Sequence, residues 1–142
     1  MSLKYLLDTN VLSEPIRPKP NPQIIKKLKQ HQDEIATATL VWHEMLFGCK
    51  RLPVSRKRQI LEQYLYEIVT KMQILDYTKE AAEWHAQERA RLSLNGKTPP
   101  FVDGQIAAIA KVNGLIIVTA NVSDYQFFEE VIIEDWQNVE NI

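Results

Sequence analysis

"KYLLDTNVLSEPIRP", Lys4 to Pro18, contains a short apolar run that ends directly on an acid, Asp8. The run "YLL" predicts a buried strand from Tyr5 to Leu7, and the prolines that follow predict a turn before the next helix. An aspartate at the end of a strand can cap the next turn through its side chain. It can also be one arm of a charged site, so the other acids of the chain have to be considered.

Short apolar runs alternate with longer helical patterns along the whole sequence, which favours an α/β domain with a mostly parallel central sheet. Further strands are expected in "EIATATL", "QILDY", "LIIVTA" and "VII". Because "LIIVTA" is apolar almost throughout, it is the expected centre of the sheet. Helices are expected after Gln23, after a cap at Thr39, from a cap at Ser55, from a cap at Thr78 to Asn95, and over 101–113.

The chain has 142 residues, of which 45% are hydrophobic and 25% charged, as in an ordinary soluble domain. We expect one domain over residues 1–142. No apolar run approaches the roughly 20 residues that cross a bilayer. No signal peptide is evident, and Cys49 is the only cysteine, so a cytoplasmic location is expected. The formal net charge of -1 gives no global basic field.

Four acids stand out by their surroundings. Asp8 and Asp124 follow predicted strands, where open α/β sheets bind ligands. Glu44 in "LVWHEMLFG" and Asp103 in "PPFVDGQIAAIA" lie in apolar helical stretches, which is unusual for unpaired acids. Each also has a simple structural role available: a cap for Asp8 or Asp124, a solvated helix edge for Glu44, and a helix dipole contact for Asp103.

Function is indicated by the four acids as a set. Two charges about 4 Å apart repel by about 4 kcal/mol at an effective dielectric near 20, so four converging carboxylates need protons or a cation. All-oxygen ligands suit Mg²⁺ or Mn²⁺. Such an ion can activate water and stabilise charge at phosphorus, as in one-metal or two-metal nucleases.

Four segments resemble the signature segments of PIN-domain proteins, and of their VapC-type ribonuclease toxins in particular. They are "LLDTNVL", "TLVWHEMLFG", "FVDGQIAAIA" and "IVTANVSDY", which occur in the family's order and span nearly the whole chain. The resemblance implies a three-layer α/β/α PIN fold and a metal-dependent endoribonuclease that acts as the toxin of a toxin–antitoxin pair.

The resemblance also assigns roles to residues. Asp8, Glu44, Asp103 and Asp124 match the family's acidic, metal-binding and catalytic quartet. Polar support would come from Thr9, Asn10, Thr119 and Asn121. The implied partners are an RNA substrate, a VapB-like antitoxin and a second copy of the chain, the last through the apolar helices around Leu46 and Leu65.

The sequence departs from many relatives at Ala120, where they carry Arg, and at Gly104, which weakens the start of its helix. Two alternatives remain. A haloacid-dehalogenase-type phosphohydrolase also has an Asp after its first strand, but it needs a second acid where this chain has Asn10. A catalytically silent PIN module that binds RNA or protein would keep the fold without the reaction.

Overall fold

Five short strands form one parallel sheet in the order β3-β2-β1-β4-β5. The computed structural model describes residues 2–137. Its strands are β1 (Tyr5–Leu7), β2 (Ile35–Ala38), β3 (Gln73–Leu75), β4 (Ile116–Val118) and β5 (Ile133–Glu134). Each neighbouring pair is parallel, so the predicted α/β class with a parallel sheet is confirmed.

The centre of the sheet is β1, whereas the sequence predicted the apolar run that contains β4. Strand β1 pairs with β2 on one side and β4 on the other, and all three of its residues are buried. Both faces of a parallel sheet are covered, so β1 and β4 are both made of apolar residues. Apolar content therefore could not rank β1 and β4.

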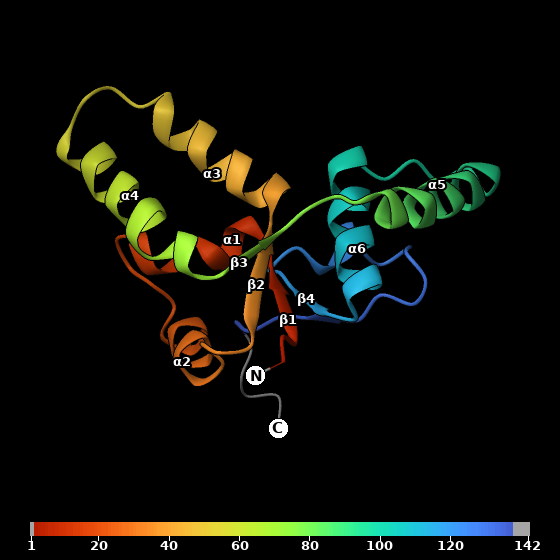
Figure 1. Cartoon of the computed structure of the whole chain (residues 1–142), viewed down its shortest axis with the longest axis horizontal. Coiled ribbons are helices and arrows are strands. Elements are labelled where there is room, and N and C mark those ends of the chain that lie inside the picture. The colour runs from red at the N-terminus through yellow and green to blue at the C-terminus, as the bar shows by residue number, and fades with distance from the viewer. Residues whose placement is uncertain (1, 138–142) are drawn as a thin grey trace.

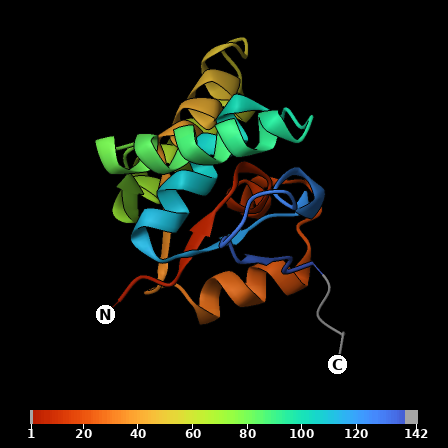
Figure 2. The same ribbon diagram turned by 90° about the vertical axis from the view of Figure 1, so that its right-hand side faces the viewer.

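Helices cover both faces of the sheet. They are α1 (Thr9–Leu12), α2 (Pro22–Gln30), α3 (Thr39–Lys50), α4 (Arg56–Glu67), α5 (Lys79–Leu94) and α6 (Phe101–Asn113), with short 3-10 turns η1 (Glu14–Ile16), η2 (Val69–Lys71) and η3 (Val122–Asp124). In Figure 1, α1 to α4 lie on one side of the strands, and α5 and α6 lie on the other. Figure 2 shows α5 lying across α6, the helix pair with the most extensive packing.

Side-chain caps set several helix boundaries at the predicted residues. Ser55 Oγ accepts from the backbone N–H of Arg58 at 3.2 Å, and Thr78 Oγ1 accepts from that of Ala81 at 3.2 Å. The predicted cap at Thr39 was wrong, since Ala38 is the cap residue and Thr39 is the first residue of α3.

One hydrophobic cluster joins the sheet to the helices on both faces, in keeping with a single domain. Leu65 is fully buried in that cluster, so it offers no surface to a second copy of the chain. The exposed large apolar residues of the α3–α4 hairpin are instead Phe47, Val54, Ile60 and Tyr66. Homodimer formation stays a prediction, and sedimentation as a 16.5 kDa monomer at micromolar concentration would refute it.

None of the helices within residues 2–137 is both long and apolar enough to traverse a membrane.

Candidate active site

The carboxyl ends of β1 and β4 meet at one point because the two strands are neighbours in parallel register. Leu7 pairs with Val118. Asp8 and Thr119, which directly follow these two residues, therefore also lie side by side. The backbone N–H of Asp8 donates to the Val118 carbonyl at 3.0 Å, which extends the pairing to the acid itself. Asp8 therefore stands at a fixed position on the edge of the sheet where ligands are expected.

Asp8 is both a helix cap and the centre of a hydrogen-bond network. Its Oδ1 accepts from the backbone N–H of Thr9 at 2.9 Å, at the start of α1. Its Oδ2 accepts from Thr119 Oγ1 at 3.0 Å and from the Tyr125 hydroxyl at 3.1 Å. Hydrogen bonds to a carboxylate stabilise its ionised form. Of the two roles considered for this residue, the cap is confirmed, and membership of a charged site stays a prediction.

A second layer of hydrogen bonds holds Thr119 in place. Asn10 Nδ2 donates to Thr119 Oγ1 at 3.3 Å, while Asn10 Oδ1 accepts from the Ala120 backbone N–H at 2.8 Å. The backbone N–H of Asn121 also donates to Thr119 Oγ1, at 3.0 Å. The structure thus brings Asn10 and Thr119 next to Asp8, whereas Thr9 and Asn121 contribute backbone N–H groups.

Charge interactions connect Asp103 with Asp8 and Asp124. Asp103 is half-buried in the first turn of α6, and Asp124 is exposed in η3. Burial, followed by the charges of Asp124 and Asp8, raises the pKa of Asp103 from 3.8 to about 6. Both charges contribute to that shift after burial, and the name carboxylate cluster is used below for Asp8, Asp103 and Asp124.

Glu44 is not joined to that cluster. It is exposed on α3, and neither a salt bridge nor a hydrogen bond ties its side chain to the residues described in the structure. Helix α3 does pack against α6, the helix that carries Asp103. Charge interactions thus connect Asp103 with Asp8 and Asp124, whereas Glu44 lies on the neighbouring helix.

The sequence analysis missed Tyr125. Its ring is buried, and burial together with the charge of Asp8 raises its pKa above the ordinary value. The hydroxyl therefore stays protonated and keeps donating to Asp8. The available signal was its position directly after Asp124 in "VSDY", where a tyrosine follows the last acid of the set.

A buried histidine supports the turn of α6 that carries Asp103. His85 on α5 is buried, and its Nδ1 shares a 2.8 Å hydrogen bond with the Tyr77 hydroxyl. Burial, with the charge of Arg89 second, lowers the pKa of His85. The ring lies directly against Gly104, where an added Cβ would overlap His85 Nε2 and come within 2.7 Å of Cδ2. Glycine at this position admits the imidazole, which explains a residue that otherwise weakens the helix.

We expect Gly104→Ala to destabilise the protein by about 1–3 kcal/mol, because an added methyl group in a packed site forces its neighbours apart. The shift should also displace Asp103 and weaken Mn²⁺ binding. The matched control is Gly48→Ala on α3, where an added Cβ meets nothing within 4 Å. This control should stabilise the helix by about 0.5–1 kcal/mol. Urea unfolding measures both changes, and equal effects at the two glycines would contradict the role given to His85.

The donors of the cluster fit Mg²⁺ or Mn²⁺ by their chemistry. Within residues 2–137, no three His, Cys, Asp or Glu side chains stand close enough to hold an ion as they are placed. Mg²⁺, however, is usually bound through one or two carboxylates and several waters, so a complete protein cage is not required. After burial, the charges of Asp124 and Asp8 contribute to the raised pKa of Asp103, and a divalent cation would offset these charges.

A family model for the PIN domain matches residues 5–127. The chain therefore belongs to the PIN-domain family, as the four segments of the sequence indicated.

Two similar proteins are toxin FitB of Neisseria gonorrhoeae and the tRNA(fMet)-specific endonuclease VapC of Salmonella typhimurium. The first is 28% identical over 137 residues, covering 94% of this chain and 99% of FitB. The second is 29% identical over 135 residues, covering 94% of this chain and 98% of that VapC.

Solved structures of the same groups share the fold. FitAB bound to an IR36 DNA fragment matches with a TM-score of 0.86 and 27% identity, covering 96% of this chain and 97% of that chain. DNA-bound VapBC from Salmonella typhimurium matches with a TM-score of 0.82 and 27% identity, covering 94% and 98%.

Proposed function

We propose that this protein is a Mg²⁺- or Mn²⁺-dependent endoribonuclease and the toxin of a toxin–antitoxin pair, acting in the cytoplasm. The observation that carries the proposal is the cluster of Asp8, Asp103 and Asp124 at the carboxyl ends of β1 and β4. Support comes from membership of the PIN family. It also comes from two relatives, one named as a toxin and one as an endonuclease, which this chain matches over nearly their whole length.

When bound, the divalent ion would supply Lewis acidity at phosphorus and lower the pKa of water. Asp8 is the anchoring ligand in this proposal. Its three donors take up three of about four lone-pair positions of the carboxylate, which leaves Oδ1 able to accept one further contact. Thr119 and Tyr125 orient Asp8, so its oxygens need no reorganisation when a cation arrives.

Asp103 would be the second ligand, and it is mostly ionised at neutral pH because its pKa is about 6. Asp124, exposed at the rim, would hold the second ion of a two-metal site or orient the attacking water. Glu44 would complete the set only if substrate or metal draws its side chain across from α3.

The test is to incubate purified protein, free of any inhibitor, with structured and single-stranded RNAs in Mg²⁺, in Mn²⁺ and in EDTA. Internal cleavage in either metal, abolished by EDTA and restored by added metal, is the expected result. RNA that is bound but left intact in both metals would favour the silent PIN module over the nuclease.

We further propose that a VapB-like antitoxin inhibits the site. FitAB and VapBC, two of the solved relatives, are described as bound to DNA, and the VapBC family is described as one of toxin–antitoxin systems. A guanidinium is the best neutraliser for a carboxylate cluster, because it stays charged and binds two oxygens at once. Apolar antitoxin residues would add affinity at the α3–α4 hairpin.

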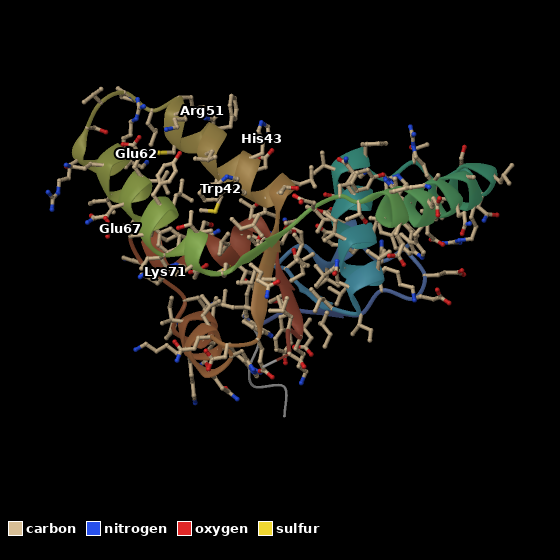
Figure 3. All side chains as sticks on the ribbon, viewed as in Figure 1. Trp42, His43, Arg51, Glu62, Glu67 and Lys71 are labelled. Atoms are coloured by element: carbon tan, nitrogen blue, oxygen red, sulfur yellow. The ribbon has the colours of Figure 1, made fainter. Side chains whose placement is uncertain are left out.

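The hairpin offers two different faces for that contact. Trp42 meets Tyr66 of α4 edge to face, with ring centroids 5.7 Å apart. Phe47 is 56% exposed and lies on the other side, between His43 and Arg51. Figure 3 shows Trp42 on the side of α3 toward α4 and His43 on the opposite side. Trp42 and Phe47 therefore lie on different faces of the hairpin, and one short antitoxin segment would contact only one of them.

We expect substitution of one arginine in the antitoxin tail to restore RNA cleavage by the purified complex. The guanidinium and the metal compete for the same oxygens, so excess Mg²⁺ should also weaken inhibition by the native tail. The toxin is co-expressed with the small gene expected beside its own, and RNA cleavage by the purified complex is measured. Substitution of an arginine outside the antitoxin tail is the control. Inhibition that survives every tail substitution would contradict the model.

A further inference from the structure

Two adjoining hollows lead from α5 to the carboxylate cluster. The first, of about 460 Å³, is lined in part by Arg89, Lys97 and Phe101. The second, of about 210 Å³, is lined in part by Lys97, Phe127 and Asp124. The segment Lys97–Pro99 lines both hollows, so the two adjoin, and the second reaches Asp124 of the cluster. The name basic–aromatic groove is used below for the surface of Arg89, Lys97, Phe101 and Phe127.

The two cations of the groove are paired with rings rather than with acids. The Arg89 guanidinium lies 4.9 Å from the centroid of Phe101, and Lys97 Nζ lies 4.7 Å from that of Phe127. In the part of the chain that the structure describes, no carboxylate lies within ion-pair distance of either cation. Nearby Arg91, by contrast, is engaged by Glu88 at 2.7 Å and Glu129 at 3.5 Å. The charges of Arg89 and Lys97 thus stay available to an anionic ligand.

The two rings of the groove are unusually open for phenylalanine. Phe101 is 47% exposed and Phe127 is 40% exposed. Such rings can stack with nucleic-acid bases of any sequence, and stacking beside cations is the common feature of single-strand binding surfaces. An acidic peptide would satisfy the cations but would leave the rings in water, so the combination favours RNA.

The backbone holds the groove in shape. Helix α5 ends at Leu94, Gly96 follows its cap residue with a φ of 74°, and the N–H of Lys97 donates back to the Leu92 carbonyl at 2.8 Å. Pro99 and Pro100 restrict the chain that follows. Figure 1 shows this loop returning from the far end of α5 to the start of α6. Lys97 is therefore presented from a fixed turn rather than from a free loop.

We propose that the basic–aromatic groove binds single-stranded RNA on one side of the scissile phosphate. Arg89 and Lys97 contact phosphates of the flanking nucleotides, and Phe127 stacks with a base beside the carboxylate cluster. The inference rests on the proposed function and names the surface that brings the substrate to it. Attraction by the groove offsets the repulsion between the RNA backbone and the three acids.

The experiment measures binding of a labelled, mixed-sequence single-stranded RNA by fluorescence anisotropy in EDTA, where cleavage does not contribute. The double variant Arg89→Gln, Lys97→Gln should bind about tenfold more weakly at low salt. The slope of log affinity against log salt should fall by about 1.4, or about 0.7 for each lost phosphate contact on a single strand. The matched control is Lys29→Gln on α2, which removes an exposed positive charge away from the groove and should change neither value.

The stacking contact is tested separately with Phe127→Leu, which keeps an apolar side chain but removes the aromatic face. This variant should bind RNA about fivefold more weakly, with the salt slope unchanged. Phe101 is left intact because its ring also packs against His85, at 4.9 Å between centroids.

Two results would overturn the inference. In the first, Lys29→Gln loses as much affinity as the double variant. In the second, polyglutamate competes as well as RNA of equal charge, which marks a surface open to any anion.

Groove-dependent binding without cleavage in Mg²⁺ or Mn²⁺ would refute the proposed function and leave the groove standing. RNA cleavage by the double variant with the same KM as the native protein would refute the groove and leave the proposed function standing.

Discussion

Replacing Asp103 by asparagine is expected to abolish RNA cleavage while raising the melting temperature of the protein. Burial and the charges of Asp124 and Asp8 raise the pKa of Asp103 to about 6, so the ionised form is disfavoured in the folded state. The amide keeps the shape of the side chain and removes the charge. Loss of a metal ligand should lower cleavage by about 100-fold or more, beyond what outer contacts to metal sites usually contribute.

The sign of the pH dependence follows from the raised pKa. Between about pH 4 and pH 6 the folded protein holds a proton on Asp103 that the unfolded chain releases, so the stability contributed by this group is lost as the pH rises to about 6. The increase in melting temperature caused by Asp103→Asn should therefore be large at pH 8 and small near pH 4. Thermal unfolding in EDTA at both values measures it, with the exposed Asp33→Asn as control. A lower melting temperature than the native protein at pH 8 would contradict the explanation.

Asp8→Asn is expected to lose cleavage to the same extent but to lose stability as well. Three donors converge on the Asp8 carboxylate, from Thr9, Thr119 and Tyr125. An asparagine offers one acceptor oxygen and turns an NH₂ group toward at least one of these donors. Leaving a buried donor unsatisfied costs about 1–3 kcal/mol. Urea unfolding of the two asparagine variants should therefore give changes of opposite sign.

Tyr125→Phe is the matched control for Asp8→Asn, because it removes one donor and keeps the carboxylate. Its loss of stability should be smaller, and much of its Mn²⁺ binding should remain. If Asp8→Asn unfolds at the same urea concentration as the native protein, the three hydrogen bonds do not hold the acid as described.

Local signals in the sequence predicted much of the fold. Ser55 and Thr78 cap their helices as expected, and Gly114 ends α6 in the left-handed conformation that glycine allows. These features depend on residues three or four apart, so they can be read from sequence alone. The order of the inner strands could not, because β1 and β4 are both short, apolar and covered on both faces.

For the candidate site, the sequence predicted the types of residue more fully than their arrangement in space. The charges of Asp8 and Asp124 do act on Asp103, but helical periodicity alone could not show where Glu44 lies relative to these acids. Tyr125 and His85 were missed because their roles depend on tertiary contacts. The Tyr125 hydroxyl bonds an acid 117 positions away in sequence, and the His85 ring fits against a glycine on another helix.

The hydrogen bonds of Asp8 also make its orientation depend on a distant part of the sequence. The partners of its Oδ2, Thr119 and Tyr125, lie 111 and 117 positions later. A nascent or prematurely terminated chain that stops before Thr119 therefore carries Asp8 without the groups that orient it. Residues 1–118 alone thus lack both side-chain donors to Asp8 Oδ2, so the acid acquires its fixed orientation only when the segment with Thr119 and Tyr125 folds onto it.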